Sequence, residues 1–482
     1  MTPGPDQVPS ARAPAAPDRL WAPGSRLLVV GVFGLMTFVA FEVFAVTTAL
    51  PVVARDLGAE RWYSLAFAAT MTTGLVGMTL GGTWADRSGP LRPLVFGGAA
   101  FLLGLALCVA APTMGVFVVG RLLQGIGGGI DSVVLYVVIA RSVREDLRPR
   151  MFGSLTLAWL LPSVVGPLVS GLLVQAVHWR VVFALVLVGS AVSLVMLVGV
   201  ARRAGKGHGG GSPFDPRLLW AGVAAAALLG LHLSGQQAVP ALVAGTVAST
   251  AVLAAAAVRL LPPGTLRARA GIPRLVLLRA LMGGAVSATD IYLPPYLQYE
   301  LGYAPAVSGL VVAVGALGWA GGAWWQGRSA EDPHRPEPLY LAAALVVCGP
   351  VGAALVVGGL LPVAAAAVCC VVMGVGMGIA MPRVSSTVMT LSPVKLQGRN
   401  GSALQIAESV VTSALVAVAG AVLTASSLGG YLPVYALVGA VALAALGVTL
   451  TLRPVRGPVD GPSGEEGGAP HHGGGDGVEG SR

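Results

Sequence analysis

The stretch FVAFEVFAVTTALPVVARDLG, residues 38–58, places Glu42 inside an apolar run that extends from about Leu27 to about Val53. This run exceeds the ~20 residues that an α-helix needs to cross a bilayer. An ionised carboxylate at the bilayer centre costs at least ~2.5–3.5 kcal/mol, and such residues usually mark functional sites. The question is therefore what kind of protein keeps an acid at this depth.

The composition predicts a polytopic membrane protein. Of the 482 residues, 55% are hydrophobic and 11% are charged, and the mean hydropathy is +0.80, whereas soluble domains average roughly 25% charged residues. The net charge is +9, but the basic residues lie in short loops between apolar runs, which argues against a nucleic-acid partner. We find no nucleotide loop and no nucleophile–base constellation, so an enzyme is not expected. The cysteines lack metal-ligand spacing and lie in apolar segments, so neither a metal site nor a cofactor is expected; they are Cys108, Cys348, Cys369 and Cys370.

Hydropathy predicts fourteen transmembrane spans. Basic residues concentrate in alternate loops, which predicts a multi-pass plasma-membrane protein with both termini cytoplasmic. The pair within 217–260 is the least certain, because His232, Gln236 and Gln237 interrupt it; without this pair twelve spans remain and the loops keep their sides. The spans lie near 27–53, 63–84, 93–111, 115–140, 152–177, 180–201, 217–234, 239–260, 274–298, 304–326, 339–359, 361–382, 401–425 and 431–452.

An internal repeat divides the chain. GGTWADRSG (81–89) recurs as GGAWWQGRSA (321–330), and the Pro51 to Gly58 spacing recurs from Pro295 to Gly302. Chance similarity between Gly/Ala-rich helices is the alternative, but transporters are often built from such repeats. We predict an all-α membrane protein with two pseudo-symmetric six-helix bundles and two additional central helices. The predicted parts are a disordered tail (1–25), a first bundle (26–201), a linker with two extra spans (202–270), a second bundle (271–453) and a disordered tail (454–482).

The loop sequence GGTWADRSGPLRP, from residue 81, resembles the loop between helices 2 and 3 of the major facilitator superfamily. The superfamily pattern is G-x-x-x-D-R-x-G-[RK]-[RK]; a simple polar turn is the alternative interpretation. The resemblance implies a cytoplasmic gate. Pro90 and Leu91 replace the two usual basic residues, and the matching positions, together with the following arginine, are Gly82, Asp86, Arg87, Gly89 and Arg92.

A basic residue, Arg121, lies within the predicted span 115–140. GRLLQGIGGGID (120–131) is similar to the R-x-x-x-G-x-G element of the superfamily, which implies a role in proton coupling for Arg121. Asp131 follows ten residues later, about 15 Å along a helix. We therefore expect no direct ion pair between them, and each needs its own partner or a wet cavity.

Residues 161–171, LPSVVGPLVSG, look like the antiporter element G-x-x-x-G-P-x-x-G-G of the superfamily. Pro167 is expected to kink the helix, and a kinked helix with small packing residues is the alternative. The motif positions are Pro162, Gly166, Pro167 and Gly171, with Ser170 in place of a glycine. The stretch 41–51 around Glu42, and HWRVVF (178–183), resemble the drug:proton antiporter branch with fourteen helices. The resemblance covers most of residues 27–452.

Four acids within spans, Glu42, Asp131, Asp290 and Glu408, are the predicted sites of proton coupling and substrate binding, together with Arg121. Burial favours the neutral form of a carboxyl group, so such acids can load and release protons. Glu42 and Asp290 are preferred, since each lies about halfway along its span. Hydrogen bonding to neighbouring helices is the structural alternative. Nearby polar residues predicted to line a substrate cavity are Tyr292, Tyr296, Gln298 and Gln405.

These features predict a proton-coupled exporter of lipophilic, cationic drugs or antibiotics that works by alternating access. Its partners would be the small-molecule substrate, protons and the lipid bilayer, and we expect a monomer. A metabolite exporter or lipid flippase of the same fold, and a non-transporting membrane sensor, are the alternatives. Substrate-dependent proton movement in proteoliposomes distinguishes them.

Overall fold

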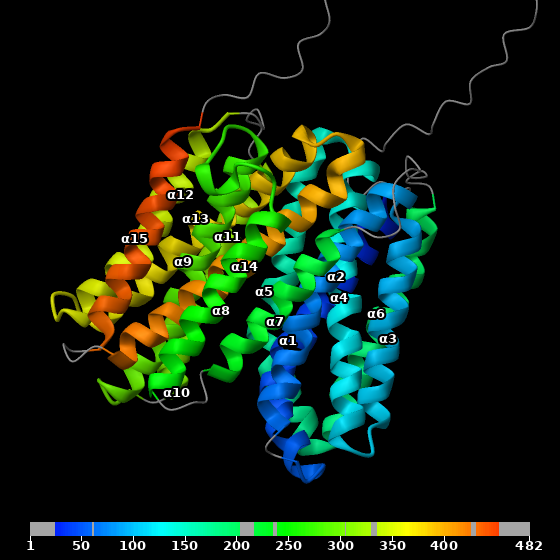
Figure 1. Cartoon of the computed structure of the whole chain (residues 1–482), viewed down its shortest axis with the longest axis horizontal. Helices are drawn as coiled ribbons and strands as arrows, with labels where there is room; N and C mark the ends of the chain where they lie inside the picture. The colour runs from blue at the N-terminus through cyan, green and yellow to red at the C-terminus, as the bar shows by residue number, and fades with distance from the viewer. Residues whose placement is uncertain are drawn as a thin grey trace, which may run out of the picture.

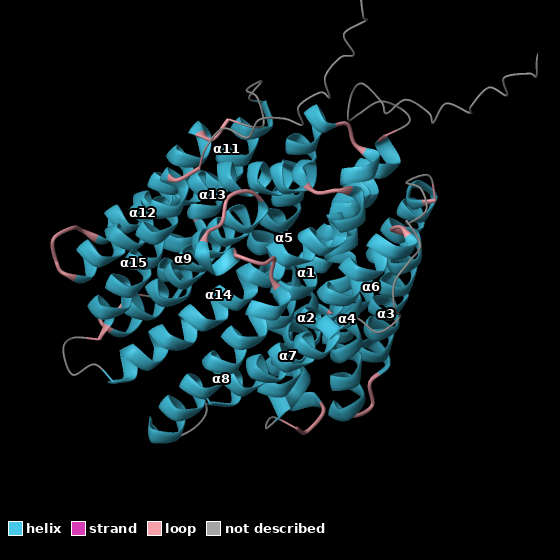
Figure 2. Ribbon diagram, turned by 45° about the horizontal axis from the view of Figure 1, so that its top comes forward, coloured by secondary structure: helices cyan, strands magenta, loops and turns pink. Residues whose placement is uncertain are grey.

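The protein is helical throughout the part of the chain that the structure describes. This structure is a computed structural model that describes residues 25–59, 62–202, 216–234, 239–303, 305–328, 335–425 and 430–452. These residues form α-helices and short 3₁₀ turns, without a strand (Figure 2). The two predicted tails, apart from residue 25, and Gln236 and Gln237 lie outside the described residues.

The first six helices pack together as one bundle, here called the N half. Long apolar runs account for each of them, since a backbone in lipid must satisfy its hydrogen bonds within the segment. Figure 1 shows these helices in colours that run from blue through cyan to green. They are α1 (Arg26–Asp56), α2 (Tyr63–Ser88), α3 (Leu91–Ala110), α4 (Met114–Ser142), α5 (Arg148–Ala176) and α6 (Trp179–Ala201).

The C half repeats this arrangement after two inserted helices. α7 (Pro216–Ser234) and α8 (Val239–Leu260) pack on each other and fill the seam between the halves, α7 against α2 and α8 against α14. The C half comprises α9 (Ile272–Tyr299), α10 (Pro305–Ala313), α11 (Gly315–Arg328), α12 (Glu337–Val357), α13 (Val363–Leu391), α14 (Gln397–Ala425) and α15 (Tyr431–Leu450).

The number of spans depends on how bent and short helices are counted. Eleven helical segments among the described residues are long and apolar enough to span a membrane, or twelve if the bent helix α5 is included. α7 is a shorter apolar helix, and α2 is not among the eleven. The predicted span 304–326 is broken into α10 and α11, which still form one passage. Fourteen spans therefore remain a prediction.

The internal repeat is visible in the packing of the helices. In the N half α4 packs on α2 and α3, while α1 packs on α5 and α6; in the C half α13 packs on α11 and α12, while α9 packs on α14 and α15. The two turn glycines of the repeat also match, because Gly58 and Gly302 both have left-handed backbones, with φ of 62° and 69°. The predicted pair of pseudo-symmetric bundles is confirmed.

Glycines allow the closest helix contacts in both halves. A Cβ at Gly77 of α2 would collide with the Ile126 carbonyl of α4, and one at Gly318 of α11 would collide with the Val371 carbonyl of α13. Small residues serve this purpose in membranes because they let two backbones approach closely. The same device therefore holds the equivalent helix pair in each half.

The halves are joined at the end of the molecule where α1 begins and α15 ends, here called the terminal face (toward the top of Figure 1). Arg148 of α5 donates to the Thr390 hydroxyl of α13 at 3.1 Å, and Arg150 donates to the Gly327 carbonyl of α11 at 2.7 Å. α2 and α4 also pack on α14. These contacts tie the two halves at the same end.

Candidate transport site

A buried ion pair lies inside the N half. Arg121 Nη1 of α4 contacts Glu42 Oε1 of α1, and the residues are only 3% and 2% exposed. The arginine also donates to Gln124 Oε1 at 2.7 Å and to the Ala66 carbonyl at 3.2 Å. All these partners belong to the N half, so this part of the structure balances the charge of Glu42 by itself.

A second ion pair lies in the C half, and sequence reasoning did not identify its cation. Arg279 Nε of α9 contacts Glu408 Oε2 of α14 at 2.9 Å. Arg279 is fully enclosed, with 3% of its side chain exposed, whereas Glu408 retains 22%. The sequence does contain a signal for it, because Arg279 lies inside the predicted span 274–298, where a basic residue requires a partner just as an acid does.

The second pair extends to the other half of the protein. Arg279 Nη1 donates to the Ser385 hydroxyl of α13 at 2.8 Å. Both terminal nitrogens also lie 3.3 Å from the Tyr136 hydroxyl of α4, in the N half. The contacts of the Arg279 guanidinium therefore depend on the relative position of the two halves.

The other two acids lack a cationic partner in the described contacts. Asp131 is completely buried, against Gly97 of α3, and neither carboxylate oxygen has a hydrogen-bond partner among the described residues. As expected, Arg121 pairs with a different acid. Asp290 of α9 is half-buried and lies near Cys370 of α13 and Tyr435 of α15.

The predicted cavity residues have diverse surroundings. The Tyr292 hydroxyl donates to the Val416 carbonyl at 2.6 Å, and the Tyr296 hydroxyl donates to the Val356 carbonyl at 3.5 Å. Gln298 is half-buried near the end of α9. The Gln405 amide nitrogen is buried without a hydrogen-bond acceptor in the described part of the chain, one turn before Glu408. Lining of a substrate cavity by these four side chains remains a prediction.

The predicted gate motif meets α14 at the terminal face. The Asp86 carboxylate accepts hydrogen bonds from the backbone N–H groups of Gly398, at 2.6 Å, and Arg399, at 2.8 Å. Asp86 lies beyond the predicted span 63–84. Burial raises its pKa to about 6, although the two backbone hydrogen bonds oppose this shift. The carboxylate is therefore still ionised at neutral pH and caps the positive end of the α14 dipole.

The other members of this motif shape the turn. A Cβ at Gly82 would lie 2.9 Å from Ser402 Oγ of α14, so glycine permits the close approach of α2 and α14. Gly89 ends α2 with a φ of 81°, a left-handed conformation that glycine adopts without strain. Arg87 is half-buried, and Arg92 is exposed in the first turn of α3.

The predicted antiporter motif lies where α5 crosses α1. Its helix axis bends by 43° between the segments Glu145–Ser163 and Leu168–Ala176, which flank Pro167. Pro162 is buried and Gly171 is half-buried. A Cβ at Gly166 would lie 3.3 Å from Phe44 Cβ, and the Ser170 hydroxyl donates to the Ala45 carbonyl at 2.9 Å. The motif thus packs directly beside the helix that carries Glu42.

Two helical bundles related by a repeat, joined at one face and carrying buried charges, define a membrane transporter of the secondary type. A family model described as Major Facilitator Superfamily matches residues 32–416, and the chain belongs to this superfamily. The protein is therefore a multi-pass membrane transporter of a small molecule and not an enzyme.

Similar sequences include proteins whose names refer to multidrug efflux or multidrug resistance. A probable multidrug-efflux transporter of Mycobacterium tuberculosis is 28% identical over 388 residues, which cover 76% of this chain and 80% of the relative. Multidrug resistance protein 3 of Bacillus subtilis is 29% identical over 174 residues, or 36% of this chain and 34% of the relative.

Solved structures share the fold. The human organic anion transporter MFSD10 superposes with a TM-score of 0.64 at 14% identity, over 89% of this chain and 100% of that chain. A bacterial homologue of the iron transporter ferroportin, in an outward-facing state, gives a TM-score of 0.62 at 15% identity, over 88% and 98%. At these identities the likeness shows the fold alone.

Proposed function

We propose that the protein exports lipophilic, cationic drugs or antibiotics in exchange for protons, by alternating access. The terminal face is then the cytoplasmic face of the plasma membrane, as the loop charges predict. The multidrug-efflux names of its relatives support the substrate class. The observation on which the proposal depends is the buried Glu42–Arg121 pair near the middle of α1.

The chemistry of this pair suits an exchange. With Glu42 ionised, the pair is neutral and the carboxylate can share its charge with an organic cation. With Glu42 protonated, the uncompensated charge of Arg121 repels that cation, while Gln124 and the Ala66 carbonyl still hold the guanidinium. Proton and substrate therefore exclude each other, and inward proton movement drives the export. The membrane potential supplies about 2.3 kcal/mol per charge per 100 mV.

The test is substrate-driven proton movement in proteoliposomes. We expect the wild type to exchange protons for dyes or cationic drugs. Glu42→Gln keeps the neutral side chain that leaves Arg121 uncompensated, so it should neither bind the cation nor move protons in response to it. Glu300→Gln is the matched control, because Glu300 is an exposed acid beyond the end of α9. Proton-coupled export that survives in Glu42→Gln would refute the role of Glu42. A response to metabolites or lipids alone would replace the substrate class, and no response to any solute would favour the sensor.

A further inference from the structure

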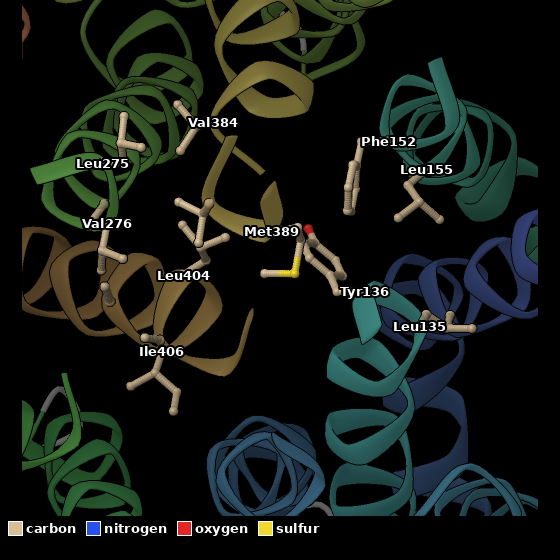
Figure 3. Close-up of a cluster of buried hydrophobic side chains, with 14 of the residues drawn as sticks. Leu135, Tyr136, Phe152, Leu155, Leu275, Val276, Val384, Met389, Leu404 and Ile406 are labelled. Atoms are coloured by element: carbon tan, nitrogen blue, oxygen red, sulfur yellow. The ribbon is translucent and has the colours of Figure 1, made fainter. Parts of the chain in front are cut away.

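One polar chain crosses the seam between the halves within the helices, rather than in the loops. It begins at Tyr136 of α4, whose ring packs on Phe152 of α5, with ring centroids 4.9 Å apart. Figure 3 shows the Tyr136 ring next to Met389 of α13, with Phe152 on its other side. The ring is therefore anchored in the N half, while its hydroxyl contacts Arg279 of the C half.

The position of Arg279 depends on Glu408. A guanidinium presents its five donors in a rigid planar fork, so fixing one edge fixes the direction of the other. Glu408 holds the Nε edge at 2.9 Å, and Ser385 holds Nη1 at 2.8 Å. Both Nη groups are then directed to Tyr136 at 3.3 Å. Without the negative charge of Glu408, nothing of opposite sign in these contacts holds the guanidinium there.

We propose that Glu408, Arg279 and Tyr136 form a charge-controlled latch between the halves. While Glu408 is ionised, Arg279 stays on Tyr136 and the terminal face remains closed. When a proton neutralises Glu408, Arg279 is released from Tyr136 and the halves can separate at this face. The inference extends the proposed exchange by alternating access, since it assigns positioning roles to Arg279 and Tyr136.

The surroundings leave Glu408 few competing charges. Among the helices that pack on α14, α9 brings Arg279 to the carboxylate and α4 brings Tyr136 close to the same guanidinium. Gly283 of α9 lies directly against the carboxylate, which leaves no room for another side chain there. Four charged or titratable groups on the other packed helices have different neighbours: Asp86 lies at the Gly398 N–H, Arg383 at the Arg335 carbonyl, Arg259 over the Trp220 ring, and Tyr435 near Asp290.

The direction of the latch agrees with an export cycle. In this structure the halves are joined at the terminal face. In the proposed cycle a protein closed at this face releases substrate on the opposite side, and a proton from that side triggers the return. Glu408 keeps 22% of its side chain exposed, whereas Arg279 is enclosed. The carboxylate is thus the member of the chain that a proton can reach. Its neutralisation would open the face from which the next substrate enters.

Hydrogen–deuterium exchange of the full-length protein in nanodiscs tests the latch. The readout is amide exchange in residues 142–148, around η2 (Glu145–Leu147), and in residues 391–398, around η4 (Val394–Leu396). Contacts across the seam lie beside these segments, since Arg148 bonds Thr390 and Arg141 bonds the Val394 carbonyl. We expect Tyr136→Phe and Glu408→Gln each to raise exchange in both segments about tenfold. Tyr340→Phe is the matched control, because its hydroxyl bonds the Leu452 carbonyl within the C half; its exchange should match the wild type.

Exchange that stays at the wild-type rate in Tyr136→Phe or in Glu408→Gln would overturn the latch. Should Glu408→Gln fail to fold, Ser385→Ala loosens the same guanidinium and must raise exchange in the same segments. Proteoliposome measurements on the wild type separate the two proposals. If the wild type moves no protons, the proposed antiport is rejected, and the amide hydrogen exchange of the variants still decides the latch. If protons move but amide exchange is unchanged in the variants, the latch alone is rejected.

Discussion

The two buried ion pairs differ in what surrounds them. Glu42 and Arg121 are enclosed within the N half. Arg121 lies about 10 Å along α4 from its first residue, at the face opposite the terminal face. Arg279 lies about 10 Å along α9 from its first residue, at the terminal face. Its guanidinium also contacts Tyr136 of the other half. One pair is therefore insensitive to the relative position of the halves, and the other depends on it.

This difference suggests a division of labour between the halves. A self-contained pair can exchange its counter-ion without disturbing the seam, which suits the binding of a proton or substrate. A pair that bridges the seam converts a change of charge into a change of contact between the halves. Pseudo-symmetric folds therefore need not place symmetric chemistry in their two bundles.

The largest expected effect comes from removing each arginine in turn. Arg121→Leu leaves Glu42 charged at 2% exposure, and breaking a buried pair in this way costs about 3–5 kcal/mol. Arg279→Leu should cost less, because water can reach the partly exposed Glu408. Thermal unfolding of both variants in one detergent measures the difference.

The double variant Glu42→Leu/Arg121→Leu sharpens this comparison. It removes both charges, so most of the stability lost in Arg121→Leu should return. The loss in Arg121→Leu should also shrink at acid pH, since protonation of Glu42 removes the unpaired charge. Equal losses in Arg121→Leu and Arg279→Leu would contradict the difference in enclosure.

The next effect tests whether the halves share their packing device. Gly77→Ala and Gly318→Ala each force a methyl group against a facing backbone carbonyl, and overpacking of this kind costs about 1–3 kcal/mol. Gly321→Ala is the control on α11, because nothing lies within 4 Å of the added Cβ. Melting temperatures should fall in both Gly77→Ala and Gly318→Ala and stay unchanged in the control. A loss in only one half would break the equivalence.

The helices and the repeat could be predicted because lipid makes them local properties of the sequence. The predicted spans 93–111 and 115–140 match Leu91–Ala110 and Met114–Ser142 closely. The span 361–382 was too short, since α13 continues to Leu391 beyond the length that a bilayer requires. Hydropathy reports the apolar part of a helix and not its hydrogen-bonded end.

The site was predicted only in part because ion pairs join distant segments. The rarity of charge inside apolar spans singled out Glu42, Arg121 and Glu408, which the structure places in two ion pairs. It did not reveal that Glu42 pairs with Arg121, because no spacing rule connects α1 with α4. Arg279 was not among the predicted residues, although the cost of burying a charge applies to a guanidinium as it does to an acid.

A smaller effect is expected at the terminal face, where equivalent helix ends differ. Asp86→Ala leaves two backbone N–H groups of α14 without an acceptor, which costs about 1–2 kcal/mol, as for the loss of a helix cap. Arg150→Ala removes one partly exposed bond to Gly327 and should cost less. Amide exchange in residues 397–402 measures the first loss. Greater opening in Arg150→Ala than in Asp86→Ala would reverse the ranking.

The smallest effect concerns the hydroxyl groups that join α1 to α5 in the N half and α9 to α14 in the C half. Ser170 of α5 bonds the Ala45 carbonyl of α1, and Tyr292 of α9 bonds the Val416 carbonyl of α14. Each is a neutral hydrogen bond, so Ser170→Ala and Tyr292→Phe should each lower stability by about 0.5–1.5 kcal/mol. Thermal unfolding measures both. A loss as large as that in Arg121→Leu would mean that helix contacts, and not charge, set the difference between the halves.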